Sequence, residues 1–273
     1  MVRGANEVIG FIGGGNMATA LVRGLLGSGR EKECIVVAEP DDTKRAALEK
    51  TFGVAVDASN VRVAKRAQMI VLAVKPQIID QVLAEIGPVL GPGQTVVSIA
   101  AGIRLDRLES GLGGSARVVR AMPNTPSLVS RGAAVLCAGA HATDADLNAA
   151  HALFETVGQA HVVDDESLMD AVTALSGSGP AYVYRLAEAL IEAGARCGLQ
   201  PDLATALAFQ TIAGAAEMML QTGESPAKLR AAVSSPGGTT VAGLNKLEEM
   251  GFASAIVSAV EAAANRSREL GAG

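Results

Sequence analysis

The sequence predicts an α/β protein in two parts, a mostly parallel sheet covered by helices and then an all-α part. Two observations support this fold class. In the first 163 residues, short β-branched runs alternate with helical patterns, which is typical of a parallel sheet with helices on both faces. After about Asp164 the strand patterns stop, and long segments rich in Ala and Leu follow. We therefore expect one domain over residues 1–163 and a second over 164–273.

The elements of the first part follow from its hydrophobic patterns in chain order. The run at 69–74 is nearly all apolar, as expected for a strand that is buried on both faces. Strands are predicted where β-branched residues cluster, at 7–12, 34–39, 69–74, 94–100, 116–122, 133–139 and 160–164. Helices are predicted between them, at 17–26, 43–52, 78–86 and 144–157.

The second part consists of amphipathic helices. Residues 182–194 place five apolar side chains on one helix face, namely Val183, Leu186, Ala187, Leu190 and Ile191. Pro201 suits the first turn of a further helix over 202–220, and 253–270 continues the pattern. Because these apolar faces are wider than one small bundle could cover, we expect them to pack against a second copy of the chain, which makes this an all-α dimerisation domain. A self-contained bundle is the alternative.

Composition excludes several function classes. The 273 residues are 49% hydrophobic, lack Trp and carry a formal net charge of -5. No cluster of positive charge suggests binding to nucleic acid or to a membrane surface, and no segment suggests a membrane span or a secretory signal. The three cysteines, Cys34, Cys137 and Cys197, are widely spaced and odd in number, which favours reduced thiols in the cytoplasm. The histidines are expected at surface or structural positions, so no metal site is expected.

The first glycine cluster, "IGFIGGGNMA", predicts a dinucleotide site. It follows a strand, opens a helix and contains the pattern Gly13-x-Gly15-x-x-Ala18. Gly13 would permit the tight turn, Gly15 would let the backbone approach a pyrophosphate, and Ala18 would let the helix lie close to the strand. The N–H groups at the start of the helix would bind the phosphates. The first domain is therefore expected to be a Rossmann-type dinucleotide-binding domain, and a tight turn without a ligand is the alternative.

The end of the second strand leaves the choice of cofactor open. Glu39 stands where a carboxylate can accept hydrogen bonds from the ribose hydroxyls, which favours NADH and would repel the 2′-phosphate of NADPH. Lys44 and Arg45 follow closely and could bind that phosphate if Glu39 turned away. They could equally be solvated helix charges.

Three other strand ends carry small or turn-forming residues, in "LAVKPQ", "SIAAG" and "AMPNTP". In an open parallel sheet, ligands lie beyond the carboxyl ends of the strands, and small residues there leave room for a flat ring. Asn124 could bind a ligand there, or it could serve as a turn residue.

Two further glycine clusters interrupt the helical part. In "SGSGPAY", residues 176–182, Ser178 and the glycines suit a crowded point where cofactor and substrate meet, although an interhelical turn is the alternative. In "SSPGGTT", Pro236 and the glycines predict a helix that starts at roughly Gly237. The N–H groups of Gly237, Gly238 and Thr239 would then converge on an anion, sized for a carboxylate. The hydroxyls of three residues would add donors, namely Ser235, Thr239 and Thr240.

These motifs, in this order, resemble the Δ1-pyrroline-5-carboxylate reductase family over nearly the whole chain. The resemblance implies reduction of the cyclic imine pyrroline-5-carboxylate to L-proline by hydride transfer from NAD(P)H, the last step of proline synthesis. It also implies intertwined helical domains that form a homodimer, in many members a decamer of five dimers, with an active site shared between partners. Family members commonly prefer NADPH, so Glu39 departs from what a phosphate pocket requires.

The resemblance also implies a set of site residues. Its cofactor loop corresponds to Ile12, Gly13, Gly14, Gly15, Asn16 and Met17. Its ribose and nicotinamide contacts correspond to Asn60, Ala73, Val74, Lys75, Pro76, Ala100, Ala101 and Gly102. Its substrate loop corresponds to residues 235–240, and we expect Thr240 to be the donor to the ring nitrogen of the imine.

Two other functions remain open at this stage. A β-hydroxyacid dehydrogenase-like reductase would share the dinucleotide domain, but such enzymes use a lysine on the first long helix of the second domain. Residues 164–227 contain no lysine. A non-catalytic dinucleotide sensor would keep the first glycine cluster but would have no use for "SSPGGTT".

Overall fold

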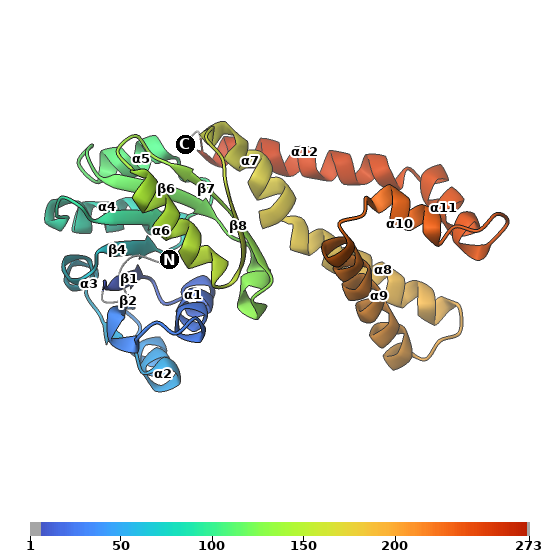
Figure 1. The fold of residues 1–273 in the computed structure, drawn as a ribbon, viewed down its shortest axis with the longest axis horizontal. Coiled ribbons are helices and arrows are strands. Elements are labelled where there is room, and N and C mark those ends of the chain that lie inside the picture. Colours follow the sequence, from blue (N-terminus) through green and yellow to red (C-terminus); the bar gives the residue numbers. More distant parts are fainter. Residues whose placement is uncertain (1–6, 272–273) are drawn as a thin grey trace. The chain divides into compact units, whose positions relative to one another are not determined.

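The computed structural model describes residues 7–271, and its first unit is built on one eight-stranded sheet (Figure 1). The strands lie in the order β3-β2-β1-β4-β5-β6-β7-β8. Every neighbouring pair is parallel except β6 and β7, which are antiparallel. The strands are β1 Ile9–Ile12, β2 Ile35–Ala38, β3 Ala55–Asp57, β4 Met69–Leu72, β5 Thr95–Ser98, β6 Arg117–Met122, β7 Gly132–Ala138 and β8 Gly158–Val162. The predicted Rossmann-type sheet is therefore confirmed.

The order of the strands reverses at β1, which pairs with β2 on one side and with β4 on the other. A crevice for a ligand forms at such a switch point, beyond the carboxyl ends of the strands. All four residues of β1, β2, β4 and β5 are buried, because helices cover both faces of the sheet.

Two hydrophobic cores fill the space between the sheet and these helices. One core contains side chains of α1, α2 and α6, among them Leu21, Leu48 and Phe154. The other contains side chains of α3, α4 and α5, among them Val63 and Leu83. The helices are α1 Asn16–Gly27, α2 Asp42–Phe52, α3 Asn60–Arg66, α4 Ile79–Ile86, α5 Leu105–Gly111, α6 Asp144–Glu155 and α7 Met169–Val172.

Four of these elements have no counterpart among the sequence expectations, namely β3, α3, α5 and α7. Helix α7 has only four residues, about one turn. Strand β3 has three residues, all only half-buried, so it gives neither an apolar run nor an alternating pattern. Helices α3 and α5 have seven residues each, about two turns, which is too short for a clear helical period.

The second unit, Gly179–Glu261, is all helical. Its helices are α8 Gly179–Arg196, α9 Pro201–Thr222, α10 Pro226–Ala232, α11 Thr239–Glu249 and the first part of α12 Phe252–Gly271. Pro201 is at the first turn of α9, as predicted. By length and composition alone, α9 is apolar enough to cross a membrane, a test that core helices of other proteins also pass.

The boundary between the units differs from the expected division after residue 163. Among the described residues, the first unit extends to Ser178 and also includes residues 262–271, the last part of α12. The reason is packing: Met169 of α7 lies in a core of the sheet unit, and the Ser267 hydroxyl donates to the buried carboxylate of Asp170 at 2.6 Å. The strand patterns in the sequence therefore end at about residue 164, but the residues that pack with the sheet continue through one more short helix, to Ser178.

The predicted apolar stripe on 182–194 does lie along α8, but the chain alone does not cover it. Only Ala187 is buried, whereas Val183, Leu186 and Leu190 are 44%, 40% and 40% exposed. The same holds for α9, where Leu207 and Phe209 are 49% and 56% exposed. These two helices therefore present a wide apolar surface within the second unit.

Candidate functional site: the strand ends and two loops

The turn between β1 and α1 requires glycine at its first position. Gly13 has φ +98°, and a Cβ there would lie 2.5 Å from the carbonyl oxygen of Ala73. Its N–H donates to the carbonyl of Ala38 at 2.9 Å. The loop is thus held between the ends of β2 and β4, where a side chain would collide with backbone.

The next glycine leaves space for a ligand. A Cβ on Gly15 would meet nothing within 4 Å, and no side chain caps the start of α1 at Gly15. Ala18 is 1% exposed, so the first turn of α1 lies close against the sheet. Uncapped N–H groups beside an open, glycine-lined surface fit a pyrophosphate, and these features are what the dinucleotide hypothesis requires.

Glu39, the expected ribose-binding residue, also holds the loop itself. Its Oε2 accepts from the N–H of Gly14 at 2.9 Å, and its Oε1 accepts from the N–H of Asp41 at 3.1 Å. The side chain is buried, at 7% exposure. Gly14 therefore directs its N–H at a carboxylate rather than at a phosphate. Each oxygen of Glu39 retains lone-pair capacity for a ribose hydroxyl.

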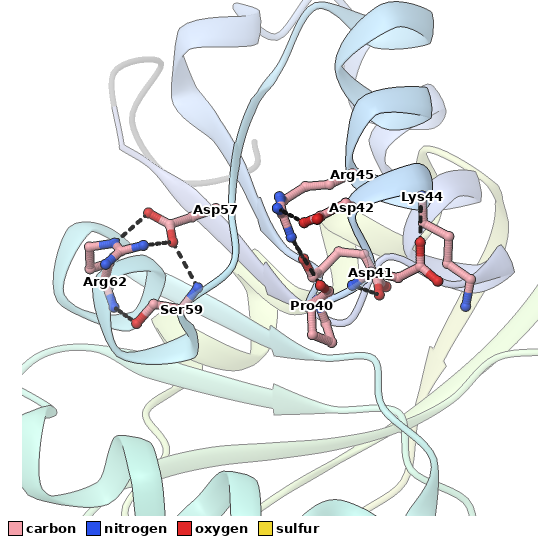
Figure 2. A network of polar contacts seen from close by, with 9 residues as sticks. Pro40, Asp41, Asp42, Lys44, Arg45, Asp57, Ser59 and Arg62 are labelled. Atoms are coloured by element: carbon pink, nitrogen blue, oxygen red, sulfur yellow. Dashed lines mark hydrogen bonds and ion pairs between the residues drawn. The ribbon is translucent and has the colours of Figure 1, made fainter.

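The cations around Glu39 are largely engaged within the chain (Figure 2). Arg45 donates to the carbonyls of Glu39 at 2.7 Å and Pro40 at 3.1 Å, and it pairs with the carboxylate of Asp42. Arg45, one of two cations that could have bound the phosphate, is therefore used to close the start of α2. Lys44 bonds Asp41 only through its backbone N–H, and within residues 7–271 its ammonium group has no partner.

A second ion pair lies at the end of β3. Arg62 contacts the carboxylate of Asp57 through two nitrogens, with the Nε contact at 2.7 Å (Figure 2). The hydrogen bond from Arg62 is the main cause that lowers the pKa of Asp57 below its ordinary value. At neutral pH the end of β3 therefore carries a paired aspartate and arginine.

Asn60, an expected cofactor contact, is the first residue of α3. Its Nδ2 donates to Glu85 Oε2 at 2.8 Å, while Gln81 donates to Glu85 Oε1 at 3.0 Å. The hydrogen bonds from Gln81 and then from Asn60 lower the pKa of Glu85. The Asn60 amide is therefore held in place by the Glu85 side chain of α4. Sequence reasoning missed Glu85, because a partner 25 positions away leaves no local pattern.

The remaining expected cofactor contacts lie at the carboxyl ends of β4 and β5. Ala73, Val74, Lys75 and Pro76 follow β4, and the N–H of Ala73 donates to the carbonyl of Ile12 at 2.8 Å. Ala100, Ala101 and Gly102 follow β5, which is hydrogen-bonded to β4 in parallel. Since β1, β4 and β5 are parallel neighbours, these residues and loop 12–17 share one edge of the sheet. Small side chains at that edge leave room for a flat ring.

The "SSPGGTT" loop lies in the second unit and differs in detail from the expectation. Helix α11 begins at Thr239, with Gly238 as its N-cap, rather than at Gly237. The N–H of Gly238 donates to the carbonyl of Ser235 at 2.9 Å, so it is not a free anion donor. Gly237, not Gly238, has the positive φ, +71°. The early turn formed by Pro236 shifted the helix start by two residues.

What remains of the loop still fits a carboxylate. Among the described residues, the hydroxyls of Ser235, Thr239 and Thr240 have no hydrogen-bonding partner, and no side chain caps the first turn of α11. The expected donors other than the Gly238 N–H therefore come together on one loop. Ser178, the remaining expected substrate contact, belongs to the other unit, where it follows a turn of π-helix at Thr173–Gly177.

Comparison with known proteins agrees with this geometry. The family described as pyrroline-5-carboxylate reductase dimerisation matches residues 166–270, and the family described as NADP oxidoreductase, coenzyme F420-dependent, matches 8–102. A pyrroline-5-carboxylate reductase of Synechocystis sp. is 45% identical over 96% of this chain and 98% of its own. A solved pyrroline-5-carboxylate reductase of Coxiella burnetii is 39% identical, with a TM-score of 0.93 over 97% of this chain and 98% of its own.

A Plasmodium falciparum pyrroline carboxylate reductase, solved with NADP bound, is 35% identical with a TM-score of 0.87 over 98% of this chain and 99% of its own. The similarity therefore covers both units, and with them the glycine loop and the "SSPGGTT" loop. A full-length relative at this level of identity, together with the dimerisation-family match, shows that the chain belongs to the pyrroline-5-carboxylate reductase family.

Proposed function

We propose that this chain reduces Δ1-pyrroline-5-carboxylate to L-proline with a hydride from NADH or NADPH. The observation that carries the proposal is the loop 12–17, where Gly15 faces open space at the uncapped start of α1. This dinucleotide site occurs in a chain with full-length similarity to proteins named pyrroline-5-carboxylate reductase. The β-hydroxyacid dehydrogenase-like alternative has no comparable support.

For hydride transfer to an imine, the main task of the protein is to orient the cofactor and the substrate. The nicotinamide, when bound, supplies a hydride to the imine carbon of the substrate. Because a protonated imine is already electrophilic, the chain needs to align two ligands and to offer a hydrogen-bonding partner to the ring nitrogen. We assign that partner to Thr240, whose hydroxyl can donate to the neutral imine nitrogen and can accept from its N–H once the imine is protonated. A hydroxyl is a weak acid, so Thr240 orients the nitrogen while the proton balance is completed by solvent.

The substrate carboxylate is assigned to the rest of the "SSPGGTT" loop. The N–H groups of Gly237 and Thr239 and the hydroxyls of Ser235 and Thr239 supply donors, and the N-terminus of α11 adds a favourable partial charge. Gly238 serves as the N-cap and keeps the loop narrow, because a Cβ there would lie 2.6 Å from Ser235 Oγ.

For the cofactor, we propose a preference for NADH. Glu39 is buried with both oxygens on backbone N–H groups, so its negative charge is fixed where the 2′-phosphate of NADPH would approach. Arg45 and Arg62, the guanidinium groups of this corner, are each paired with an aspartate. Lys44 is the cation in this corner that remains for a phosphate. The Plasmodium relative was solved with NADP bound. The proposed preference for NADH therefore rests on the residues of this chain and not on that relative.

We further propose that the working form is a homodimer, with a pentamer of dimers as the larger assembly, in the cytoplasm. The exposed apolar faces of α8 and α9 support the dimer, and the three unpaired cysteines support a reducing compartment. In this assembly the "SSPGGTT" loop of one protomer completes the site of its partner, as the family resemblance implies.

The test is a steady-state assay of NADH and NADPH oxidation with Δ1-pyrroline-5-carboxylate. We expect saturable, enzyme-dependent oxidation of both cofactors, with the higher kcat/KM for NADH. Little reduction of NAD should occur with 2-hydroxy acids. A folded sample that binds the cofactor, measured by fluorescence titration, but oxidises none of it with this substrate would contradict the proposed reaction.

A further inference from the structure

The Asn124 amide links three segments of the first unit. Its Oδ1 accepts from the N–H of Ala133 at 2.9 Å. Its Nδ2 donates to the carbonyl oxygen of Ser176 at 3.1 Å and approaches the Ser176 hydroxyl at 3.3 Å. A backbone N–H is a donor and a backbone carbonyl is an acceptor, so these partners define the orientation of the amide. Asn124 thus joins the end of β6 and the start of β7 to residues 173–178.

The segment that Asn124 holds is a π-turn. Residues Thr173–Gly177 are wound with i to i+5 hydrogen bonds, and the N–H of Ser178 donates to the carbonyl of Thr173 at 2.8 Å. The ordinary helical donor for the Ser176 carbonyl would be the residue four positions later, but that residue is Pro180, which has no N–H. The Asn124 side chain donates to this carbonyl. Without this donor the wide turn could relax toward an ordinary α-helical turn, which would rotate the residues that follow.

A second contact keeps the turn against the sheet. A Cβ on Gly177 would lie 2.5 Å from Cε of Met122, the last residue of β6. Strand β6 is parallel to β5, so its carboxyl end lies at the same edge as the small residues Ala100 to Gly102. The π-turn is therefore fixed beside the strand ends proposed to hold the nicotinamide.

The hydroxyl of Ser178 has no hydrogen-bonding partner within the part of the chain that the structure describes. Its backbone N–H is used by the π-turn, and the residue is half-buried. A free hydroxyl on a residue whose backbone is fixed in this way suits the binding of a small polar ligand. Its direction depends on the turn, and the turn depends on Asn124.

We propose that Asn124 is a positioning residue for substrate: it holds the π-turn in the register that directs the Ser178 hydroxyl toward the proposed nicotinamide edge. Asn124 acts through this turn and does not itself touch a ligand. The inference rests on the proposed function, since substrate use is how the effect is measured.

The test substitution is Asn124→Asp. The carboxylate keeps an acceptor for the Ala133 N–H, but it replaces the donor to Ser176 with an oxygen that faces a carbonyl oxygen. We expect the kcat/KM for Δ1-pyrroline-5-carboxylate to fall at least tenfold, with a higher KM for that substrate. Fluorescence titration should give the wild-type cofactor Kd and the wild-type number of sites per chain. That stoichiometry separates positioning from a loss of folded protein.

Two matched variants limit the interpretation. Asn148→Asp places the same new charge on the exposed face of α6 and should leave all parameters unchanged. Ser176→Ala removes only the 3.3 Å contact and should stay within about twofold of wild type, because the carbonyl contact remains.

The outcomes distinguish this inference from the function on which it rests. Wild-type turnover combined with an unchanged efficiency in Asn124→Asp would overturn the positioning role alone. A parallel loss of cofactor sites in that variant would also overturn it, because Asn124 would then support the fold or the cofactor. A wild-type chain that binds cofactor but does not turn over Δ1-pyrroline-5-carboxylate would overturn the proposed function, and this inference with it.

Discussion

At the scale of single residues, the polar groups at the proposed site already have hydrogen-bonding partners within the protein. Glu39 accepts two backbone N–H groups, Asn60 is fixed by Glu85, and Asn124 is held between two strands and a turn. Such groups are pre-organised, because their geometry is set before a ligand binds. A substitution of Glu39 or Asn60 would therefore change both a proposed ligand contact and the local structure, and each experiment needs a variant that separates the two.

Glu39→Ser is expected to shift cofactor use toward NADPH. Loss of one charge facing a phosphate is worth about 1–3 kcal/mol at intermediate dielectric. The ratio of kcat/KM for NADPH to that for NADH should therefore rise by about five- to 150-fold. Glu39→Ser also removes the acceptors for Gly14 and Asp41, so efficiency with both cofactors will fall, but the ratio cancels that loss.

Glu39→Gln is the matched variant, because it removes the charge and keeps an oxygen that can accept one of the two N–H groups. It should reproduce most of the shift in the ratio. Glu49→Gln, on the exposed face of α2, controls for net charge. A ratio unchanged in both Glu39 variants would show that the carboxylate does not face the 2′ position.

Thr240→Ala is expected to lower the kcat/KM for Δ1-pyrroline-5-carboxylate by about ten- to a hundredfold. The lost hydrogen bond joins the hydroxyl oxygen to the N–H of the protonated imine, and a bond to a charged group is worth roughly 1.5–3 kcal/mol. The Kd for NADH should hardly change, because the proposed dinucleotide site is loop 12–17 in the first unit. Thr240→Ser keeps the hydroxyl and should recover most of the efficiency. An intact efficiency in Thr240→Ala, or a weakened cofactor Kd alone, would mean that "SSPGGTT" only starts a helix or contacts the cofactor.

At the scale of elements, the turn between β1 and α1 combines backbone strain with close packing. Gly13 needs a positive φ and has the Ala73 carbonyl within 2.5 Å of where a Cβ would be. Gly29 also has a positive φ, +88°, but nothing lies within 4 Å of its would-be Cβ. The two positions therefore separate the cost of the conformation from the cost of the collision.

Gly29→Ala should lower the free energy of unfolding by roughly 1–2 kcal/mol, the cost of left-handed backbone for a residue with a Cβ. Gly13→Ala should cost more, because it adds an overlap with backbone that cannot move aside, and it should also abolish cofactor binding. Thermal melting at one protein concentration and fluorescence titration measure the two effects. Equal losses of stability in the two variants would contradict the packing argument.

Which elements and contacts could be predicted from the sequence depends on whether their residues leave a local pattern. Strands β1, β2 and β4 were predicted because burial on both faces keeps polar side chains out of them, and β5 was predicted from its β-branched residues. The glycine loops were predicted because their conformations demand particular residues. Strand β3 and the pairs Asn60–Glu85 and Asn124–Ser176 could not be, because they depend on contacts between segments 25 to 52 positions apart or on only half-buried residues. The use of the Gly238 N–H within its own turn also required the geometry.

At the scale of the whole molecule, apolar surface is distributed unequally. The two cores of the first unit are closed, with Phe11, Leu21 and Ile70 completely buried. Most of the large apolar side chains that remain exposed belong to residues 179–261. Such a surface is costly in water, at about 25 cal/mol for each Å² of apolar area. A monomer rarely leaves so much of it uncovered, which favours a second copy of the chain as its cover.

The exposed apolar faces of α8 and α9 predict a dimer. Sedimentation at micromolar concentration should show a dimer or a multiple of it. Leu207→Glu places a charge on the apolar face of α9, at a residue that is 49% exposed in the single chain, so it should cost little unless a partner covers that face. We expect this variant to sediment as a smaller species and to lose most turnover, because the proposed shared site needs the partner's loop. Its cofactor binding should persist in the first unit.

Thr51→Glu, on the exposed surface of α2, introduces the same charge and should leave both assembly and turnover intact. A clean wild-type monomer that still reduces Δ1-pyrroline-5-carboxylate would contradict both the dimer and the shared site, because the "SSPGGTT" loop and the nicotinamide edge would then have to meet within one chain.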